Sequence, residues 1–355
     1  MKIDFTKKLL AWNLDQNIRS MPWKGETDPY RIWLSEIILQ QTRVEQGTAY
    51  YERFILRFPT IADLANAPEK EIFKYWEGLG YYSRCRNLIA TAKKIVTNHQ
   101  GRFPATYAEI LELPGIGPYT ASAISSFAFG LPYAVVDGNV ERVLARFFGI
   151  SAPVGSAAGK KLYTSLAGDL LDKKSPGIYN QAIMDFGATI CKPQNPLCHI
   201  CIQSAACEAF NQGWVTKLPV KAAAPARKKR WFYYFIVAAG KNKIWIRKRT
   251  GNDIWQNLYE FVLWESGKII PQDKMHQTSF FKKQFGMQGE KIKNISPVIN
   301  QTLTHQIITT CFVHLDKPCN RLPGYESVEV KSLAEYPFPK IIADYVKNLM
   351  GADAW

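Results

Sequence analysis

The chain has no hydrophobic run long enough to cross a membrane. Residues 231–239 form its longest apolar stretch, which is typical of a strand. The opening sequence MKIDFTKKLLAW also lacks the apolar stretch of a secretory signal. We therefore expect a protein of a reducing compartment, the cytoplasm, associated with the nucleoid and with no membrane partner.

Acidic residues are in the minority. Thirty Asp and Glu stand against 45 Lys and Arg, which gives a formal net charge of +15. Such an excess favours a polyanionic partner, most often nucleic acid, although a basic protein need not bind DNA. Much of the excess lies in KAAAPARKKR (221–230), a segment that resembles a linker rather than a recognition element.

Cysteine is also scarce, with seven residues in 355, yet four stand within a short C-x6-C-x2-C-x5-C array. The four are Cys191, Cys198, Cys201 and Cys207. In a reducing compartment such clustering indicates metal rather than disulfides. Zinc sites usually pair two C-x2-4-C units, whereas this array holds one short pair, so zinc and a four-iron cluster both stay open. Cys85, Cys311 and Cys319 are predicted to be ordinary thiols.

The length allows two or three cores. Apolar spacing of three and four predicts a helical first part up to about residue 210, with helical segments at 30–46, 51–58, 69–79, 87–98 and 119–129. Residues 212–230 predict a linker. The pattern WFYYFIVAAGKNKIWIRKRT then predicts two strands joined by a turn, and later strands are expected near 261–265 and 307–315. A final helix is expected at 339–349.

The segment LPGIGPYTA (113–121) stands between two helical stretches. Gly115 and Gly117 permit a tight turn with bare amides, and Pro118 suits the first turn of the next helix. Amides at a helix N-terminus bind anions, so this segment predicts a helix-hairpin-helix that grips a DNA phosphate. The alternative is a plain turn between helices.

Two carboxyl groups lie near apolar sequence. Asp137 precedes a helical run in VVDGNVERVLAR and can act as an N-cap, but its approach is unusually apolar. Glu36 lies in WLSEIILQQT, where its helical neighbours include Ile32, Trp33 and Leu39. A carboxyl in such surroundings has a raised pKa and can act as a general acid, although on its own a helix glutamate is more often solvated or ion-paired.

Taken together, these motifs resemble the endonuclease III superfamily of DNA glycosylases. More narrowly, the chain resembles its MutY-type adenine DNA glycosylases through SEIILQQTRV, GLGYYSRCRNL, LPGIGPYTA, VVDGNVERV, NQAIMDFGATIC and the cysteine array. The resemblance spans about residues 8–215. The later part resembles the MutT-like (Nudix) domain of that branch, in which Trp255-Gln-Asn-Leu-Tyr-Glu-Phe matches W-x-x-L-W-E-F with Tyr259 replacing the second Trp. The glutamate-rich box of Nudix hydrolases is missing, so this domain is expected to recognise rather than hydrolyse.

The resemblance implies a multidomain protein. Its parts are an all-α helix-hairpin-helix glycosylase domain (1–211, hairpin about 106–130, iron–sulfur loop 191–207), a linker (212–230) and an α/β Nudix-like domain (231–355). It also implies a [4Fe-4S] cluster on the four cysteines, which would shape the loop and present cations such as Lys192 to phosphate. The expected partner is double-stranded DNA with adenine opposite 8-oxoguanine or guanine, bound by a monomer.

The resemblance also implies a mechanism. Bifunctional relatives carry a lysine after G-I-G-P, whereas this chain has Tyr119, which cannot form a Schiff base. A monofunctional glycosylase follows, in which Glu36 protonates adenine N7 and Asp137 stabilises the oxocarbenium ion. Tyr119 is expected to support that cation and Asn139 to orient Asp137.

Further contacts are implied by position. Gln181 matches the adenine contact, and Trp23 and Lys24 are expected to line the same pocket. Gln41 and Thr42 match a wedge that fills the duplex after base flipping, and Leu79 and Tyr81 match a probe beside the lesion in an exposed loop, with core packing as the plainer reading. Leu303-Thr304-His305 matches the Phe-Ser-His lesion-reading loop with Leu for Phe and Thr for Ser, so Thr304 and His305 are expected to contact the lesion.

Three alternatives stay open at this point. An endonuclease III-like lyase acting on oxidised pyrimidines disagrees with Tyr119 and with the added C-terminal domain. A non-catalytic iron–sulfur DNA-binding protein that senses redox state has no need of paired Glu36 and Asp137. A thymine mismatch glycosylase is a third, less favoured option.

Overall fold

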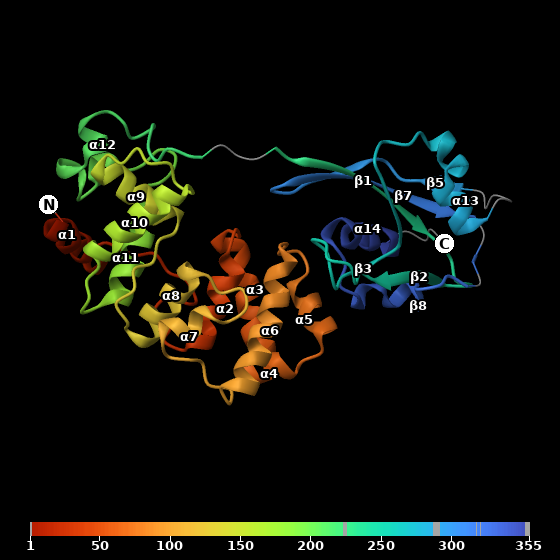
Figure 1. Cartoon of the computed structure of the whole chain (residues 1–355), viewed down its shortest axis with the longest axis horizontal. Coiled ribbons are helices and arrows are strands. Elements are labelled where there is room, and N and C mark those ends of the chain that lie inside the picture. The colour runs from red at the N-terminus through yellow and green to blue at the C-terminus, as the bar shows by residue number, and fades with distance from the viewer. Residues whose placement is uncertain (1, 223–225, 287–291, 317, 320, 352–355) are drawn as a thin grey trace. The chain divides into compact units, whose positions relative to one another are not determined.

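The computed structural model describes residues 2–222, 226–286, 292–316, 318–319 and 321–351 (Figure 1). The chain forms two units. The first comprises Met1–Ala67 and Arg86–Ala223, and the second comprises Pro68–Cys85 and Ala224–Trp355. Among the described residues, we find no helix with the length and apolar character that crossing a bilayer requires.

The first unit is helical, which confirms the all-α expectation. Its helices are α1 (Lys2–Asp15), α2 (Pro29–Leu39), α3 (Val44–Arg57), α4 (Ile61–Asn66), the later part of α6 (Tyr82–Asn98), α7 (Tyr107–Leu111), α8 (Pro118–Phe129), α9 (Gly138–Phe148), α10 (Ala157–Leu170), α11 (Pro176–Thr189) and α12 (Glu208–Asn211). Local sequence explains many of the starts, because Asp28 and Asp137 cap α2 and α9 and a proline opens α2, α8 and α11.

One expected helix is interrupted. The apolar pattern predicts a single helix over residues 30–46, but α2 ends at Leu39 and α3 begins at Val44. Gln41 adopts φ of 56°, in the left-handed region, and this residue turns the chain between the two helices. The prediction was wrong because the apolar spacing continues through the break.

One hydrophobic core of the first unit packs α1, near the N-terminus, against α9 and α11. α1 contributes Phe5 and Trp12, and α11 contributes Phe186, whose ring lies 5.0 Å from that of Trp12 in an edge-on contact. α9 adds Val140, Val143, Leu144 and Phe147, an apolar stripe at helical spacing. This packing fixes α9 and α11, which carry several of the predicted functional side chains.

The second unit contains two sheets, which confirms the α/β expectation. A five-stranded sheet has the order β4-β1-β7-β5 with β6 also paired to β7, and a three-stranded sheet has the order β3-β2-β8. The strands are β1 (Lys228–Ile236), β2 (Lys243–Lys248), β3 (Tyr259–Glu260), β4 (Val262–Ser266), β5 (Ile292–Ile295), β6 (Ile299–Thr302), β7 (Gln306–Leu315) and β8 (Glu326–Glu329). The helices are α5 (Glu69–Trp76), the start of α6, α13 (Ser279–Phe285) and α14 (Lys340–Gly351).

The two strands expected on either side of residues 240–242 are present as β1 and β2, but most of their pairing lies in two different sheets. β1 pairs with β7 in parallel and with β4 in antiparallel orientation, while β2 belongs to the other sheet. Beyond the end of β1, the predicted turn is closed by a bridge between Ala238 and Ile244 and by hydrogen bonds from the Ala239 amide to the Lys243 carbonyl (2.9 Å) and from the Trp245 amide to the Val237 carbonyl (3.0 Å). The pairing groups of β1 are taken by strands distant in sequence, which a local pattern does not reveal. β1 also begins at Lys228, inside the segment expected to be linker.

Candidate active site

A cavity of about 880 Å³ opens in the first unit and is lined by residues of α2, α8, α9, α11 and the segment before α2. It brings together the residues predicted from distant parts of the sequence. They are Trp23, Lys24, Glu36, Gln41, Thr42, Tyr119, Asp137, Asn139 and Gln181. The cavity has the volume of a ligand site, and polar and charged side chains line it together with apolar ones such as Ile32 and Leu39.

Glu36 lies on the buried side of α2 and is 8% exposed. Burial raises the pKa of Glu36 to about 7, a hydrogen bond from the Tyr119 hydroxyl opposes that rise, and the charge of Asp137 adds to it. Burial likewise raises the pKa of Tyr119 well above its ordinary value, so the phenol stays protonated and donates. Glu36 is therefore a carboxyl that holds a proton near neutral pH.

Asp137 serves two roles at once. Its Oδ1 accepts from the backbone amides of Asn139 (2.9 Å) and Val140 (2.8 Å), so it caps α9, and its Oδ2 accepts from the Asn139 side chain (2.7 Å). Burial raises the pKa of Asp137 above its ordinary value, although these three donors and the positive charge of Arg142 oppose that rise. Each donor stabilises the carboxylate, and Glu36 has no comparable set of donors.

A chain of hydrogen bonds links Asp137 to the cysteine array. Arg142 donates to the Asn139 side-chain oxygen (2.9 Å), to the Gly187 carbonyl (2.7 Å) and to the Cys191 carbonyl (2.7 Å). Sequence reasoning missed Arg142, although its spacing of three from Asn139 places both on one helical face. The arrangement fixes the amide that holds Asp137.

Asp185 is a second functional residue that the sequence did not reveal. Its side chain is completely buried and accepts from Arg19 (2.8 Å), Lys24 (2.9 Å), Asn17 (2.9 Å) and Gln181 (2.9 Å). Gln181 thus donates its amide nitrogen to Asp185, which leaves its carbonyl oxygen for the cavity. The signal was the spacing of four between Gln181 and Asp185 on α11, but the two cations lie far away in sequence.

The hairpin between α7 and α8 has the predicted form. Gly115 adopts φ of 74°, and a Cβ there would lie 2.4 Å from the Asn87 side-chain nitrogen, so only glycine fits. Gly117 is the N-cap of α8, with Pro118 in the first turn. Both glycines are exposed. Free amides at the start of a twelve-residue helix form an anion site.

The residues predicted to enter the duplex differ in exposure. Gln41 is exposed, and Tyr81 is 40% exposed with φ of 47°. Gln41 and Tyr81 therefore both hold a backbone conformation that is rare for residues with a side chain. Leu79 is only 6% exposed, so the exposure expected for it is wrong. The Leu79 amide donates to the Trp76 carbonyl, and the Leu79 side chain packs inward.

The four cysteines line one small cavity in the first unit, beside Ile190, Leu197, Phe210 and Val215. Arg146 reaches this cavity, with Nη1 3.5 Å from the Cys191 sulfur and 2.7 Å from the Lys192 carbonyl. No three His, Cys, Asp or Glu side chains of the described residues are placed to hold a metal ion. The four thiols are the donor type that both zinc and iron–sulfur clusters use.

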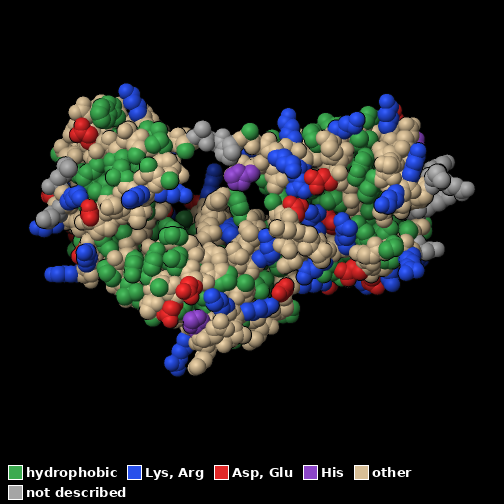
Figure 2. Space-filling view, viewed as in Figure 1, with side chains coloured by type: hydrophobic (Ala, Val, Ile, Leu, Met, Phe, Trp, Pro, Cys, Tyr) green, Lys and Arg blue, Asp and Glu red, His purple; other side chains and the backbone are tan. Residues whose placement is uncertain are grey.

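In the second unit, Leu303–Gln306 forms the tight turn between β6 and β7, with Thr304 and His305 exposed at its tip. The hydroxyl groups of Thr304 and Tyr81 are hydrogen-bonded within this unit. Basic side chains are spread widely over the face in Figure 2, whereas acidic side chains form smaller groups.

Comparisons with known proteins agree with this geometry. The model of the HhH-GPD superfamily of base excision DNA repair proteins matches residues 34–163, and a NUDIX domain model matches residues 233–348. An adenine DNA glycosylase of Buchnera aphidicola subsp. Schizaphis graminum is 36% identical over 297 residues, which cover 79% of this chain and 83% of that protein. The chain belongs to the adenine DNA glycosylase family.

Other relatives match the first part. Human adenine DNA glycosylase is 44% identical over 215 residues, covering 58% of this chain and 39% of the human protein. The solved structure of a thermostable thymine-DNA glycosylase is 30% identical, with a TM-score of 0.54, and covers 59% of this chain and 97% of its own. An endonuclease III–DNA complex, 20% identical with a TM-score of 0.50, covers 60% of this chain and 98% of its own and shares the fold.

Proposed function

We propose that this protein is a monofunctional DNA glycosylase of base excision repair that removes adenine paired with 8-oxoguanine or guanine. One observation carries the proposal: Glu36, whose pKa is about 7, shares a cavity with Asp137, which is held by three hydrogen-bond donors. One carboxyl is suited to give a proton and the other to remain charged, which is the division of labour of glycoside hydrolysis.

The reaction begins with adenine turned out of the stack into the cavity. Neutral adenine is a poor leaving group because its departure would place negative charge on the base. Protonated Glu36 gives its proton to adenine N7, so that the base leaves neutral as the bond between N9 and the sugar breaks. The Tyr119 hydroxyl is hydrogen-bonded to Glu36 and helps to orient that carboxyl.

The sugar becomes an oxocarbenium ion as the base departs. Asp137 stabilises this cation or captures it briefly before water completes hydrolysis, and Asn139 holds the Asp137 carboxylate in place. Tyr119 lines the same cavity and supports the cation with its ring. The carbonyl oxygen of Gln181, left free by its bond to Asp185, suits the amino group of adenine. Trp23 and Lys24 complete the pocket wall.

Duplex binding uses separate residues. Gly115 and Gly117 bind a phosphate, and Gln41, Thr42 and Tyr81 contact the duplex, whereas the buried Leu79 supports its loop from within the core. Thr304 and His305 contact the oxidised base from the turn of the second unit. The division into a glycosylase domain, a linker and a Nudix-like domain belongs to the same proposal, with the later domain beginning at Lys228 and with Pro68–Cys85 grouped with it. A monomer acting in the cytoplasm on nucleoid DNA belongs to it as well.

The cysteines Cys191, Cys198, Cys201 and Cys207 would hold a [4Fe-4S] cluster. When bound, it supplies a rigid loop rather than a chemical step. The chain's own contribution is Arg146, whose bonds to the Cys191 sulfur and the Lys192 carbonyl hold the loop against α9.

Single-turnover base release tests the proposal. The substrates are a duplex with adenine opposite 8-oxoguanine and one with thymine glycol, each assayed with and without alkali. We expect adenine release, with strand scission only after alkali. Scission without alkali, or activity on thymine glycol alone, would assign a lyase, and binding without any release would assign a non-catalytic DNA-binding protein.

A further inference from the structure

Hydrogen bonds fix the backbone of the turn that carries Thr304 and His305. The Leu303 amide donates to the Gln306 carbonyl (2.8 Å), which closes the turn. The Lys228 amide donates to the His305 carbonyl (2.9 Å), and Arg227 Nε donates to the Thr304 carbonyl (3.4 Å). The two tip side chains are therefore exposed on a backbone whose carbonyls are already bonded to the start of β1.

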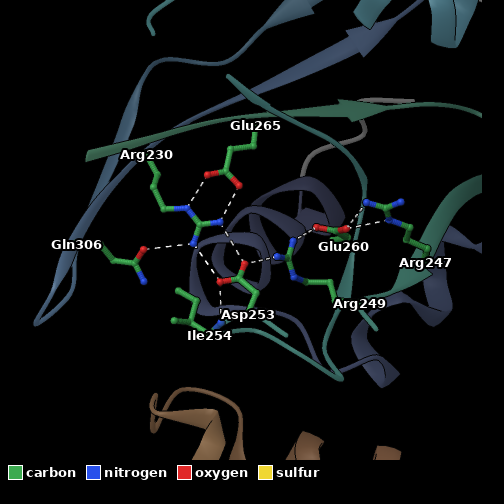
Figure 3. A network of polar contacts seen from close by, with 8 residues as sticks. All are labelled: Arg230, Arg247, Arg249, Asp253, Ile254, Glu260, Glu265 and Gln306. Carbon is green, nitrogen blue, oxygen red and sulfur yellow. Dashed lines mark hydrogen bonds and ion pairs between the residues drawn. The ribbon is translucent and has the colours of Figure 1, made fainter. Parts of the chain in front are cut away.

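The side chain of Gln306 adds a connection of another kind. Its Oε1 accepts from Arg230 Nη1 at 3.2 Å, so the last residue of the turn is joined to a guanidinium on β1 (Figure 3). Arg230 also binds Glu265 through two hydrogen bonds of 2.7 Å and Asp253 through bonds of 3.0 and 3.2 Å. Its side chain is 11% exposed and lies over the Phe232 ring.

The network continues away from the turn. Arg249 joins Asp253 to Glu260, and Arg247 binds Glu260 at 2.8 Å on the far side (Figure 3). Three arginines are matched by three carboxylates, so the group is close to neutral. Arg230 is the member that touches the turn, whereas Arg247 is 40% exposed at the opposite end.

We propose that Arg230 is a positioning residue for lesion recognition, which fixes the Leu303–Gln306 turn through Gln306 while Asp253 and Glu265 hold its guanidinium. Neither Arg230 nor its two carboxylates needs to touch DNA. This inference rests on the proposed role of Thr304 and His305 and extends it to a set of residues that the turn sequence alone does not identify.

The physical reason lies in the shape of the guanidinium. Five donors in a rigid fork satisfy Glu265, Asp253 and Gln306 at the same time, which an ammonium group with three donors does not achieve. Without this fork, Gln306 loses its bond to Arg230, and the turn is left with its backbone bonds, the bond from Arg227 to the Thr304 carbonyl and the bond between the Thr304 and Tyr81 hydroxyl groups. A recognition turn with greater freedom distinguishes two similar bases less well, because ordering it on binding costs entropy.

The test compares single-turnover rates of adenine release from duplexes with 8-oxoguanine and with guanine opposite the adenine. For Gln306→Ala we expect the ratio of the two rates to fall about fivefold, the size of one typical lost hydrogen bond, and for Arg230→Lys by more. The rate on the guanine duplex should stay unchanged. Gln306→Glu keeps an acceptor for Arg230 and should preserve the ratio.

Arg247→Gln is the matched control, because it weakens the same network at the end that does not touch the turn. Thermal unfolding of every variant shows which ones are folded. If the native protein has no preference between the duplexes, the lesion-reading function fails, and this inference with it. If the preference exists but survives in Gln306→Ala and Arg230→Lys, or falls equally in Arg247→Gln, Arg230 is not a positioning residue.

Discussion

Buried carboxyl groups in the two units have different partners, a phenol in the first unit and arginines in the second. In the first unit, Glu36 is 8% exposed with a phenol as its hydrogen-bond partner, and its pKa rises to about 7. In the second unit, Glu260 is 1% exposed but lies between Arg247 and Arg249. Asp253, in the same network, has a lowered pKa, because the rise caused by burial is outweighed by hydrogen bonds from Arg230 and from the Ile254 amide together with the charges of Arg230 and Arg249. Burial therefore makes Glu36 a weak acid, whereas the buried carboxylates of Glu260 and Asp253 form ion pairs with neighbouring arginines.

The same contrast exists within the first unit. Asp185 is fully buried beside the cavity, yet Arg19 and Lys24 bind its two oxygens. Glu36 and Asp185 therefore serve one pocket with different chemistry. One is available for proton transfer, and the other holds the wall in place. Replacing each carboxyl by its amide should separate the two roles.

Glu36→Gln should have the largest effect. The amide cannot protonate adenine, so we expect single-turnover base release to fall about 10³-fold or more, while affinity for the duplex changes little. Filter binding on the same duplex provides the comparison. An equal loss of affinity and of rate would remove Glu36 from the role of general acid.

Asp137→Asn should come next, with a loss of about 10²- to 10³-fold in rate, because the cation of the sugar loses its counter-charge. Asparagine is as good an N-cap as aspartate, so α9 should keep its start and the free energy of unfolding should change by less than about 1 kcal/mol. Chemical denaturation and base release on the same preparation separate the two effects. A variant that unfolds easily but retains its rate would make Asp137 a cap and nothing more.

Asp185→Asn should act mainly on stability. It leaves Arg19 and Lys24 without their anion, and removing one partner of a buried pair costs about 3–5 kcal/mol. Because Arg19 is 24% and Lys24 26% exposed, we expect a smaller loss of about 2 kcal/mol. Urea unfolding measures it. A variant with unchanged stability but a rate as low as that of Glu36→Gln would contradict the division between the two carboxyls.

Between pH 6 and 8, the pH dependence should be the smallest effect. Only protonated Glu36 donates, and its pKa is about 7. The rate of base release should therefore be highest below pH 7 and fall about tenfold for each further unit above it. Single-turnover rates between pH 6 and 9 at constant ionic strength test this. A rate that rises across this range would mean that a deprotonated group is limiting.

The sequence predicted the helices because they depend on local features, and it placed Asp137 as an N-cap and Glu36 among apolar neighbours within one turn. The pairing of these two carboxyls in one site was implied by the family resemblance and not by the local pattern. The break at Gln41 was missed because it depends on one backbone angle and not on polarity. The pairing of β1 with β7 and the partners of Asp185 were missed because they join segments far apart in the chain, where no periodicity operates.

The central claim is that Glu36 holds its proton near neutral pH because it is buried without a cation. Carbon-detected NMR of the side-chain carboxyl groups, recorded across pH 3–9 for the native protein and for Glu36→Gln, measures this directly. The account predicts one carboxyl resonance with a midpoint near pH 7 that is missing from the variant. A midpoint for Glu36 near 4.5, its ordinary value, would contradict the account.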